Sequence, residues 1–260
     1  MINLIKGDCL VEMQNIPDKS VDAIICDLPY GTTACKWDTI IPFEPLWAQY
    51  KRIIKDNGAI VLFGSQPFTS ALVMSNPKWF KYEWIWEKSV GSNFAALKYQ
   101  PMKEHENVLV FSKATHNYYP IKQERKGSGK ERQKAGYSNS KATAKTGQFI
   151  GGVMDATKRK NEYEELRFPS SIQFFNNREK IRGLHPTQKP LDLLEYLVKT
   201  YTKEWDTVLD NTMGSGTTGV ACRKLNRSFI GIEMDSKYFQ IACDRIDNAK
   251  PSVSLFSECP

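Results

Sequence analysis

The chain has 260 residues, enough for one large domain or for one domain with an insertion, and its 41% apolar content can supply a hydrophobic core. Its six cysteines include no C-x-x-C pair, a pattern that gives neither a zinc site nor a disulfide scaffold and fits a reducing compartment. No apolar run approaches the ~18–20 residues of a membrane span. We therefore expect a soluble cytoplasmic protein with no bound metal and no membrane contact.

The net charge of +7 is concentrated in one segment. Residues 122–183 contain 15 Lys and Arg against 7 Asp and Glu, a balance of +8, so the rest of the chain is nearly neutral. Such a segment is either a solvated, partly flexible loop or a surface that binds a polyanion. Charge alone does not separate these two interpretations.

The first part of the chain alternates buried apolar runs with helical patterns. This alternation is typical of βα units and predicts a mostly parallel sheet. The Asp-Asn-Gly tripeptide at residues 56–58 is expected to end the first helix. The expected strands are residues 21–26, 59–64, 82–88 and 107–113, and the expected helices are residues 43–54 and 67–75.

The middle of the chain has a different composition. Residues 122–152 are polar, rich in Gly, Ser and Lys, and almost without an apolar period, which predicts an insertion or a loop. The βα pattern returns near residue 190. The expected helices there are residues 190–202, 217–225 and 236–246, and the expected strands are residues 206–211 and 228–233.

A glycine-rich loop, "VLDNTMGSGTTG", joins an expected strand to an expected helix. Gly214 and Gly216 let a ligand approach the main chain, and the helix start offers free N–H groups. Val220 stands where a Walker phosphate-binding loop needs lysine, which excludes that loop. A dinucleotide loop is the alternative, but Asp210 would repel a pyrophosphate and attract a cationic amino group. With Glu233 placed to bind ribose hydroxyls, this loop favours S-adenosylmethionine over NAD.

The stretch "DLPYG" follows the apolar strand at residues 21–26. Asp27 and Tyr30 flank a proline-stiffened turn at the carboxyl end of that strand, where ligands bind in open α/β sheets. The carboxylate can accept a hydrogen bond from an exocyclic amino group, and the tyrosine ring can stack on a planar base. The alternative is an acid that caps a turn beside a tyrosine packed at the sheet edge. The glycine loop in the same chain favours a pocket for an extruded nucleobase.

Five segments of the chain resemble motifs of the β-class amino-group DNA methyltransferases. The stretch "DLPY" resembles their D-P-P-Y signature, "LDNTMGSGTTG" their cofactor loop, and "HPTQKP" the H-P-T-x-K-P segment that precedes this loop. "GIEMD" is similar to their ribose-binding strand end, and "GDCL" to a segment that holds the cofactor adenine. The catalytic motif precedes the cofactor loop, which is the motif order of the β class.

This resemblance implies a doubly wound, mostly parallel, seven-stranded α/β sheet in circularly permuted order, the fold of S-adenosylmethionine-dependent methyltransferases. The expected parts are a catalytic half, a basic target-recognition insertion that contacts DNA, and a cofactor-binding half. Their expected boundaries are residues 1–113, 114–183 and 184–260.

The implied activity is site-specific transfer of a methyl group from S-adenosylmethionine to N6 of an adenine flipped out of double-stranded DNA. Cytosine N4 is the alternative acceptor, although cytosine enzymes typically carry serine in place of Asp27. An RNA methyltransferase and a non-catalytic DNA-binding module are more distant alternatives. The resemblance is compatible with a cognate restriction endonuclease and with a second copy of the chain as partners.

The resemblance also assigns roles to individual residues. His185 and Lys189 have alternatives, a structural histidine and a surface lysine. Leu28 replaces the first proline of the signature while keeping its carbonyl as an acceptor, and Met213 is expected to pack near the cofactor in place of the usual phenylalanine. The implied catalytic residues are Asp27, Leu28, Pro29 and Tyr30. The implied cofactor-binding residues are Asp8, Cys9, Asp27, Thr187, Lys189, Asp210, Asn211, Met213, Gly214, Ser215, Gly216, Thr217, Glu233 and Met234.

Overall fold

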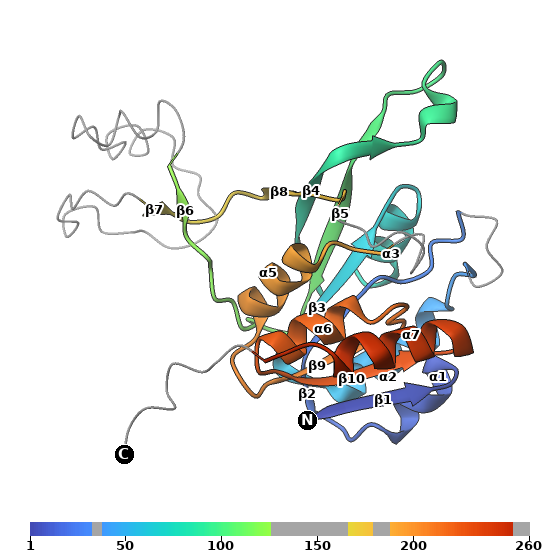
Figure 1. Ribbon diagram of the computed structural model, residues 1–260, viewed down its shortest axis with the longest axis vertical. Coiled ribbons are helices and arrows are strands. Elements are labelled where there is room, and N and C mark those ends of the chain that lie inside the picture. Colours follow the sequence, from blue (N-terminus) through green and yellow to red (C-terminus); the bar gives the residue numbers. More distant parts are fainter. Residues whose placement is uncertain (33–37, 126–165, 179–187, 252–260) are drawn as a thin grey trace. The chain divides into compact units, whose positions relative to one another are not determined.

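The computed structural model describes residues 1–32, 38–125, 166–178 and 188–251 (Figure 1). The contacts divide the chain into one unit made of Met1–Tyr119 and Ser171–Pro260, and a second unit made of Pro120–Ser170. The expected boundaries at residues 113/114 and 183/184 stay a prediction. Within the described ranges, no helix combines the length and the apolar character needed to cross a bilayer.

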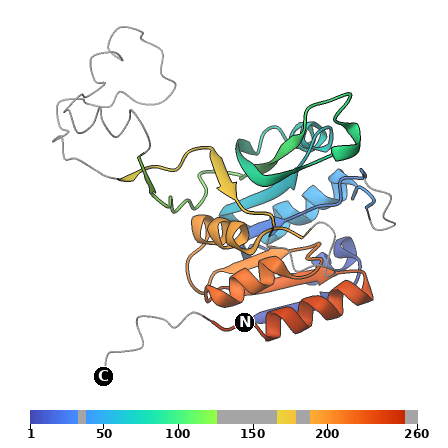
Figure 2. The same cartoon turned by 45° about the horizontal axis from the view of Figure 1, so that its top comes forward.

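The first unit is built on one mixed sheet covered by helices on both faces (Figures 1 and 2). Its strands are β1 (Ile2–Lys6), β2 (Val21–Cys26), β3 (Ile54–Gly64), β4 (Phe80–Ser92), β5 (Lys103–Phe111), β8 (Ile172–Phe175), β9 (Thr207–Asp210) and β10 (Ser228–Glu233). Its helices are α1 (Cys9–Glu12), α2 (Phe43–Ile53), α3 (Phe68–Ser75), α5 (Leu191–Tyr201), α6 (Thr217–Lys224) and α7 (Ser236–Asp247), with 3₁₀ turns η1 (Met13–Asn15) and η2 (Phe94–Ala96).

The strand order across the sheet is β1-β10-β9-β2-β3-β5-β4-β8. Strand β5 runs antiparallel to both of its neighbours, and the other pairs are parallel. The mostly parallel, doubly wound sheet expected from the sequence is therefore confirmed. Among the described residues it has eight strands rather than seven, because the short strand β8 adds to the edge of β4.

The two halves of the chain meet at the centre of this sheet. Strand β2 pairs with β9, so that Ala23 lies beside Val208 and Ile24 beside Leu209. Because side chains alternate along a strand, β2 serves both layers of the core. Ala23 and Ile25 pack in the cluster that includes α5, α6 and α7, whereas Ile24 packs in the cluster that includes α2 and α3.

One local prediction needs correction, and one strand was missed. The Asp-Asn-Gly tripeptide does not end the first helix, because α2 stops at Ile53 and β3 begins at the next residue and runs through the tripeptide. The pairing of β3 with β2 is irregular between Val21 and Ala23, which accommodates this early start. Strand β1 was not expected from the sequence. It pairs in parallel with β10 at the other sheet edge.

The second unit is described only at its two ends. Strand β6 (Gln123–Glu124) pairs with β7 (Leu166–Arg167) in antiparallel fashion, and Lys122 lies over the Phe168 ring at 5.9 Å. This short ladder brings residues 123–124 and 166–167 of the basic segment together. The stretch between the two strands, where most of the expected DNA-contacting charge falls, lies outside the described residues.

Candidate active site

A cavity of about 710 Å³ lies at the carboxyl ends of the central parallel strands. Because parallel strands end at one edge of a sheet, the loops after β2, β9 and β10 meet there. The cavity is lined by the "DLPY" turn after β2, by the glycine loop after β9 and by Glu233 at the end of β10. The segments expected to bind a base and a cofactor therefore line one continuous space.

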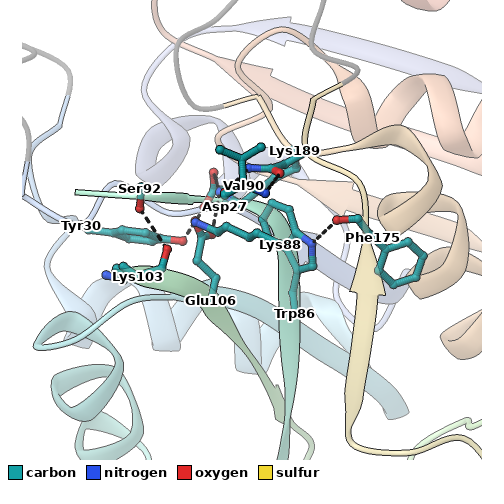
Figure 3. A network of polar contacts seen from close by, with 11 residues as sticks. Asp27, Tyr30, Trp86, Lys88, Val90, Ser92, Lys103, Glu106, Phe175 and Lys189 are labelled. Atoms are coloured by element: carbon teal, nitrogen blue, oxygen red, sulfur yellow. Dashed lines mark hydrogen bonds and ion pairs between the residues drawn. The ribbon is translucent and has the colours of Figure 1, made fainter. Parts of the chain in front are cut away.

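Asp27 stands at the centre of a buried polar network (Figure 3). Its Oδ1 accepts a hydrogen bond of 2.7 Å from the Tyr30 hydroxyl, and its Oδ2 pairs with the Lys189 ammonium. Burial raises the pKa of Asp27 above its ordinary value, although the Lys189 cation opposes the rise. The hydroxyl bond in turn fixes the tyrosine ring, which stacks on Phe68 with centroids 5.0 Å apart.

Leu28 is held by packing. Its side chain is 3% exposed and belongs to the apolar cluster on the α2 face of the sheet. The main chain beside it is fixed from the cofactor half, because the Thr212 hydroxyl donates a hydrogen bond of 2.9 Å to the Asp27 carbonyl. A leucine at this position thus keeps the turn anchored without the ring of the first proline.

Lys189 is buried, with only 8% exposed, and is not the surface lysine considered as an alternative. Its Nζ also lies 3.4 Å from Glu106 Oε2 and 5.0 Å from the centre of the Phe63 ring. Lys88 pairs with the other oxygen of Glu106 at 2.5 Å. Burial opposes the charged form of Lys189, but Asp27 and Glu106 outweigh it and raise the pKa of the ammonium.

The glycine loop is bonded from both sides. Gly216 has a φ of +77° and starts α6, a conformation that a residue with a Cβ adopts only with strain. Arg245 on α7 donates to the Ser215 Oγ at 2.9 Å and to the Thr217 Oγ1 at 3.2 Å. Asn211 accepts a hydrogen bond of 2.5 Å from the buried Tyr50 hydroxyl. These contacts hold the loop in shape before any ligand binds.

Asp210 is almost fully buried at the base of this loop. It accepts a hydrogen bond of 2.7 Å from the Thr218 hydroxyl and one of 3.2 Å from the Thr212 backbone N–H. Burial raises the pKa of Asp210 to about 7. Near neutral pH this carboxyl therefore changes its charge, a property that matters for any cationic ligand.

At the other end of the cavity, Glu233 accepts a hydrogen bond of 2.9 Å from the Gly214 backbone N–H. Burial raises the pKa of Glu233. Asp8 caps α1 by accepting from the Leu10 N–H at 2.8 Å, and Met234 beside Glu233 is exposed. Cys9 follows Asp8 and is half-buried in the same wall.

Several buried polar atoms at the cavity have no hydrogen-bond partner among the described residues. An unpaired buried polar atom costs roughly 1–3 kcal/mol, so natural proteins keep few without a purpose. Of the seven such side-chain atoms in the described part of the chain, four belong to residues that line this cavity. They are Ser65 Oγ, Glu106 Oε2, Gln188 Oε1 and Asn211 Nδ2. The cavity is thus equipped for a polar ligand.

Nearly all residues singled out in the sequence line this one cavity. Gly216 shapes the loop from behind without lining the space. His185 and Thr187 lie outside the described residues. The others, which do line the cavity, are Asp8, Cys9, Asp27, Leu28, Pro29, Tyr30, Lys189, Asp210, Asn211, Met213, Gly214, Ser215, Thr217, Glu233 and Met234.

Comparison with known protein families identifies the family that has these cavity residues. A family model for N6/N4-type DNA methylases matches residues 21–244, a span that holds the "DLPY" turn, the glycine loop and Glu233. The chain belongs to this family. It is therefore a DNA methyltransferase of the amino-group type, and S-adenosylmethionine is the methyl donor of that family.

Individual relatives of this DNA methylase extend over nearly its full length. It is 27% identical to the Type II methyltransferase M.HinfI of Haemophilus influenzae, over 96% of this chain and 69% of the relative. It is also 27% identical to the Type II methyltransferase M.HpaI of Haemophilus parainfluenzae, over 94% of this chain and 74% of the relative.

Solved structures share the fold of this DNA methylase. The complex of M1.HpyAVI with S-adenosylmethionine matches with a TM-score of 0.60 and 27% identity, covering 95% of this chain and 100% of that chain. The cytosine-N4-specific PvuII DNA methyltransferase matches with a TM-score of 0.62 and 15% identity, covering 94% of this chain and 86% of that chain. At that identity the second match is a likeness of fold alone.

The sequence did not reveal several residues of this methylase site. Glu106 and Lys88 stand on strands β5 and β4, and Arg245 stands on α7. In the sequence, Glu106 and Lys88 have the ordinary appearance of solvated charges in alternating strands. Thr212 lies inside the glycine-rich loop, but its hydroxyl contact with the Asp27 carbonyl could be found only in the structure.

The Thr212 contact gives a first prediction. Thr212→Val removes the hydroxyl that holds the Asp27 carbonyl and is expected to lower the free energy of unfolding by about 1–2 kcal/mol. Because the catalytic turn is then less well positioned, kcat is expected to fall roughly tenfold. Thermal unfolding and steady-state methylation measure both effects. Thr212→Ser keeps the hydroxyl and should behave like the unsubstituted protein, and equal losses in both variants would contradict the assigned role.

Proposed function

We propose that this DNA methylase transfers a methyl group from S-adenosylmethionine to N6 of an adenine that is flipped out of duplex DNA. The observation that carries this proposal is the single cavity that joins the Asp27–Tyr30 turn to the glycine loop and Glu233. Its size suits a nucleoside cofactor and one base together. The acid at Asp27, where cytosine enzymes typically have serine, supports adenine.

The cavity residues fit the cofactor. Asp210 is a buried carboxyl for the cationic amino group of the methionine part, and Asn211 Nδ2 is an unpaired donor beside it. Glu233 is an acceptor for ribose hydroxyls, and Asp8 lies in the same wall for the adenine amino group. When bound, S-adenosylmethionine supplies an electrophilic methyl group on a sulfonium centre.

The residues around Asp27 prepare the acceptor amine. An exocyclic amino group is a poor nucleophile because its lone pair is delocalised into the ring. Hydrogen bonds to the Asp27 carboxylate and the Leu28 carbonyl favour a tetrahedral nitrogen and stabilise the positive charge that develops on it. The Tyr30 ring, held by its hydroxyl bond to Asp27 and by its stacking on Phe68, offers a flat surface for the flipped base.

The experiment that tests this function uses methylation-free DNA. The purified protein and labelled S-adenosylmethionine are incubated with unmodified genomic DNA, and the product nucleosides are separated. The expected product is N6-methyladenosine in its deoxy form. N4-methylcytosine as the only product would replace the adenine proposal by the cytosine alternative, and label found only in added RNA would overturn DNA as the substrate.

Asp210 predicts a pH dependence of cofactor binding. Its pKa of about 7 means that the carboxylate is mostly neutral at pH 6 and mostly ionised at pH 8. A cationic amino group pairs only with the ionised form, so affinity for S-adenosylmethionine is expected to be roughly 5–10-fold weaker at pH 6 than at pH 8. Isothermal titration at several pH values measures this change.

The matched control for this prediction is Asp210→Asn. It keeps the size and the hydrogen-bonding oxygen but cannot ionise, so its affinity should be low at both pH values and nearly independent of pH. A wild-type affinity that stays constant from pH 6 to pH 8 would contradict the role assigned to Asp210.

A further inference from the structure

Four charged side chains form a compact cluster in the wall of the cavity (Figure 3). Asp27 and Glu106 supply two negative charges, and Lys88 and Lys189 supply two positive charges. They come from the turn after β2, from strands β4 and β5, and from the residues before α5. The charges of these four side chains balance, which lowers the cost of burying them, and the partly buried Lys103 lies near Glu106 and Lys88.

Within this cluster Lys189 has two carboxylates within reach. It pairs with Asp27 Oδ2, and its Nζ lies 3.4 Å from Glu106 Oε2. The other oxygen of Glu106 is taken by Lys88 at 2.5 Å. Glu106 Oε2 accepts no hydrogen bond from the described residues, although it is buried. One acceptor atom is therefore held open at the side of the lysine.

The proposed reaction places a demand on Asp27 that the observed contacts do not meet. Both of its oxygens are occupied, Oδ1 by the Tyr30 hydroxyl and Oδ2 by Lys189. A base amino group needs one of these oxygens as its acceptor. A lysine cation left beside the amine would also oppose the positive charge that develops on that nitrogen during transfer.

We propose that Glu106 is a positioning residue that becomes the main hydrogen-bond partner of Lys189 when the target amino group binds Asp27. A shift of less than roughly one ångström brings Nζ from 3.4 Å to an ordinary charge-assisted hydrogen bond with Glu106 Oε2. Asp27 Oδ2 then loses its short contact with the lysine and can accept a hydrogen bond from the amine, while the buried lysine keeps a counter-ion. This inference rests on the proposed function for its purpose, but the shift itself is a property of the chain.

The competing explanation is that Glu106 only neutralises the two lysines. The two explanations differ in a double variant. If charge balance alone matters, Glu106→Gln combined with Lys88→Met restores neutrality and should restore activity. If Lys189 needs a second carboxylate, the double variant stays impaired, because Lys189 still has only Asp27 as its partner.

A crystal structure of Asp27→Ala tests the shift without any assay of activity. With Asp27 removed, Lys189 Nζ is expected at roughly 2.8 Å from Glu106 Oε2 instead of 3.4 Å. A lysine that turns away from Glu106, or that stays at or beyond the present distance, would overturn the proposal. The Asp27→Ala structure tests the shift of Lys189 even if Glu106 variants do not fold or if the wild-type protein methylates no DNA.

Kinetics test the consequence in the active enzyme. Glu106→Gln is expected to lower kcat by roughly 10²-fold, while the Kd for S-adenosylmethionine and the KM for DNA change less than about threefold. The control is Glu87→Gln, which changes an exposed carboxylate on the neighbouring strand and should leave kcat unaltered. Thermal unfolding of each variant establishes that it is folded.

The double variant Glu106→Gln with Lys88→Met is expected to stay within about threefold of the kcat of Glu106→Gln alone. A return to near the wild-type kcat would support charge balance and overturn the positioning role. A wild-type protein with no activity on DNA would count against the proposed function only, since the structure of Asp27→Ala reports on Lys189 independently.

Discussion

Asp27→Ala is expected to lower kcat for methyl transfer by about 10²–10³-fold, the loss that other enzymes show when one preorganised charge-stabilising group is removed. Two physical effects act in the same direction. The variant removes the carboxylate proposed to accept the amino group, and it removes a negative charge near a nitrogen that must become positive while the Lys189 cation remains in the cluster. Removal of Asp27 also takes a counter-ion from Lys189, whose side chain is 9% exposed, so the variant is expected to lose stability as well.

Single-turnover methylation of an unmodified duplex measures this effect, and isothermal titration shows whether the cofactor still binds. Affinity for S-adenosylmethionine is expected to stay within about threefold of the wild type, because the glycine loop is untouched. Asp27→Asn keeps an acceptor oxygen without the charge, so its kcat should lie between those of the wild type and of Asp27→Ala. The matched control is Asp56→Ala at an exposed surface ion pair, which should change kcat little. A loss of less than tenfold in Asp27→Ala would contradict the assigned role.

Gly216→Ala is expected to destabilise the fold by about 2–5 kcal/mol, the sum of left-handed strain and overpacking. The φ of Gly216 is +77°, and a Cβ there would lie 2.8 Å from the Ala242 Cβ and 3.1 Å from the Ile246 Cδ1. Both neighbours belong to α7, which also carries the arginine that fastens the loop. The loop and helix must therefore separate, and cofactor affinity should fall with stability.

Thermal unfolding is expected to shift downward by roughly 5–15 °C for this variant. A double variant separates the two contributions. Ala242→Gly removes the nearest atom, so Gly216→Ala should cost less in that background, by about 1–2 kcal/mol, while the strain at residue 216 remains. Equal costs in both backgrounds would show that steric contact with α7 is not the cause, and an unchanged melting temperature would refute the prediction altogether.

The main elements of the fold followed from local patterns. Strands β2 and β10 have the bounds expected from their apolar runs, and α6 and α7 end within one residue of the expected positions. β2 is a continuous apolar run that is buried at every position, and α7 has a helical apolar pattern that begins at the capping residue Asp235. Such signals are carried by neighbours in sequence, and this is why they are readable.

Strand β3 shows where local signals fail. Its first half contains Asp-Asn-Gly, which locally favours a turn, yet the strand runs through it. Residues 55–58 form an irregularity without partners on β2, between the pairs Ile54–Val21 and Ala59–Ala23, and Gly58 is buried there. Gly58 fits at this position only because it has no side chain, since a Cβ would lie 2.6 Å from the Ile54 Cγ1. Tertiary packing here overrides the turn preference of the tripeptide.

The charged cluster could not be predicted from the sequence, for a different reason. Lys88 stands between Glu87 and Ser89, and Glu106 lies in a polar stretch of β5, so both look in the sequence like charges that contact water. They are buried because β4 pairs with β5, placing Trp86 opposite Glu106, and because Lys189 arrives from a distant part of the chain. Lys189 lies 162 positions from Asp27 in the sequence, so no pattern of neighbouring residues indicates their contact.

The junction of β2 with β9 also sets the order in which this molecule gains its activity during synthesis. The bond from Thr212 to the Asp27 carbonyl joins positions 185 residues apart, and Glu233 is made later still. The turn after β2 leaves the ribosome before the loops after β9 and β10, so a growing chain that lacks these two strands has no complete cavity. A product that is terminated before β9 is therefore expected to transfer no methyl group, because it lacks one wall of the cavity.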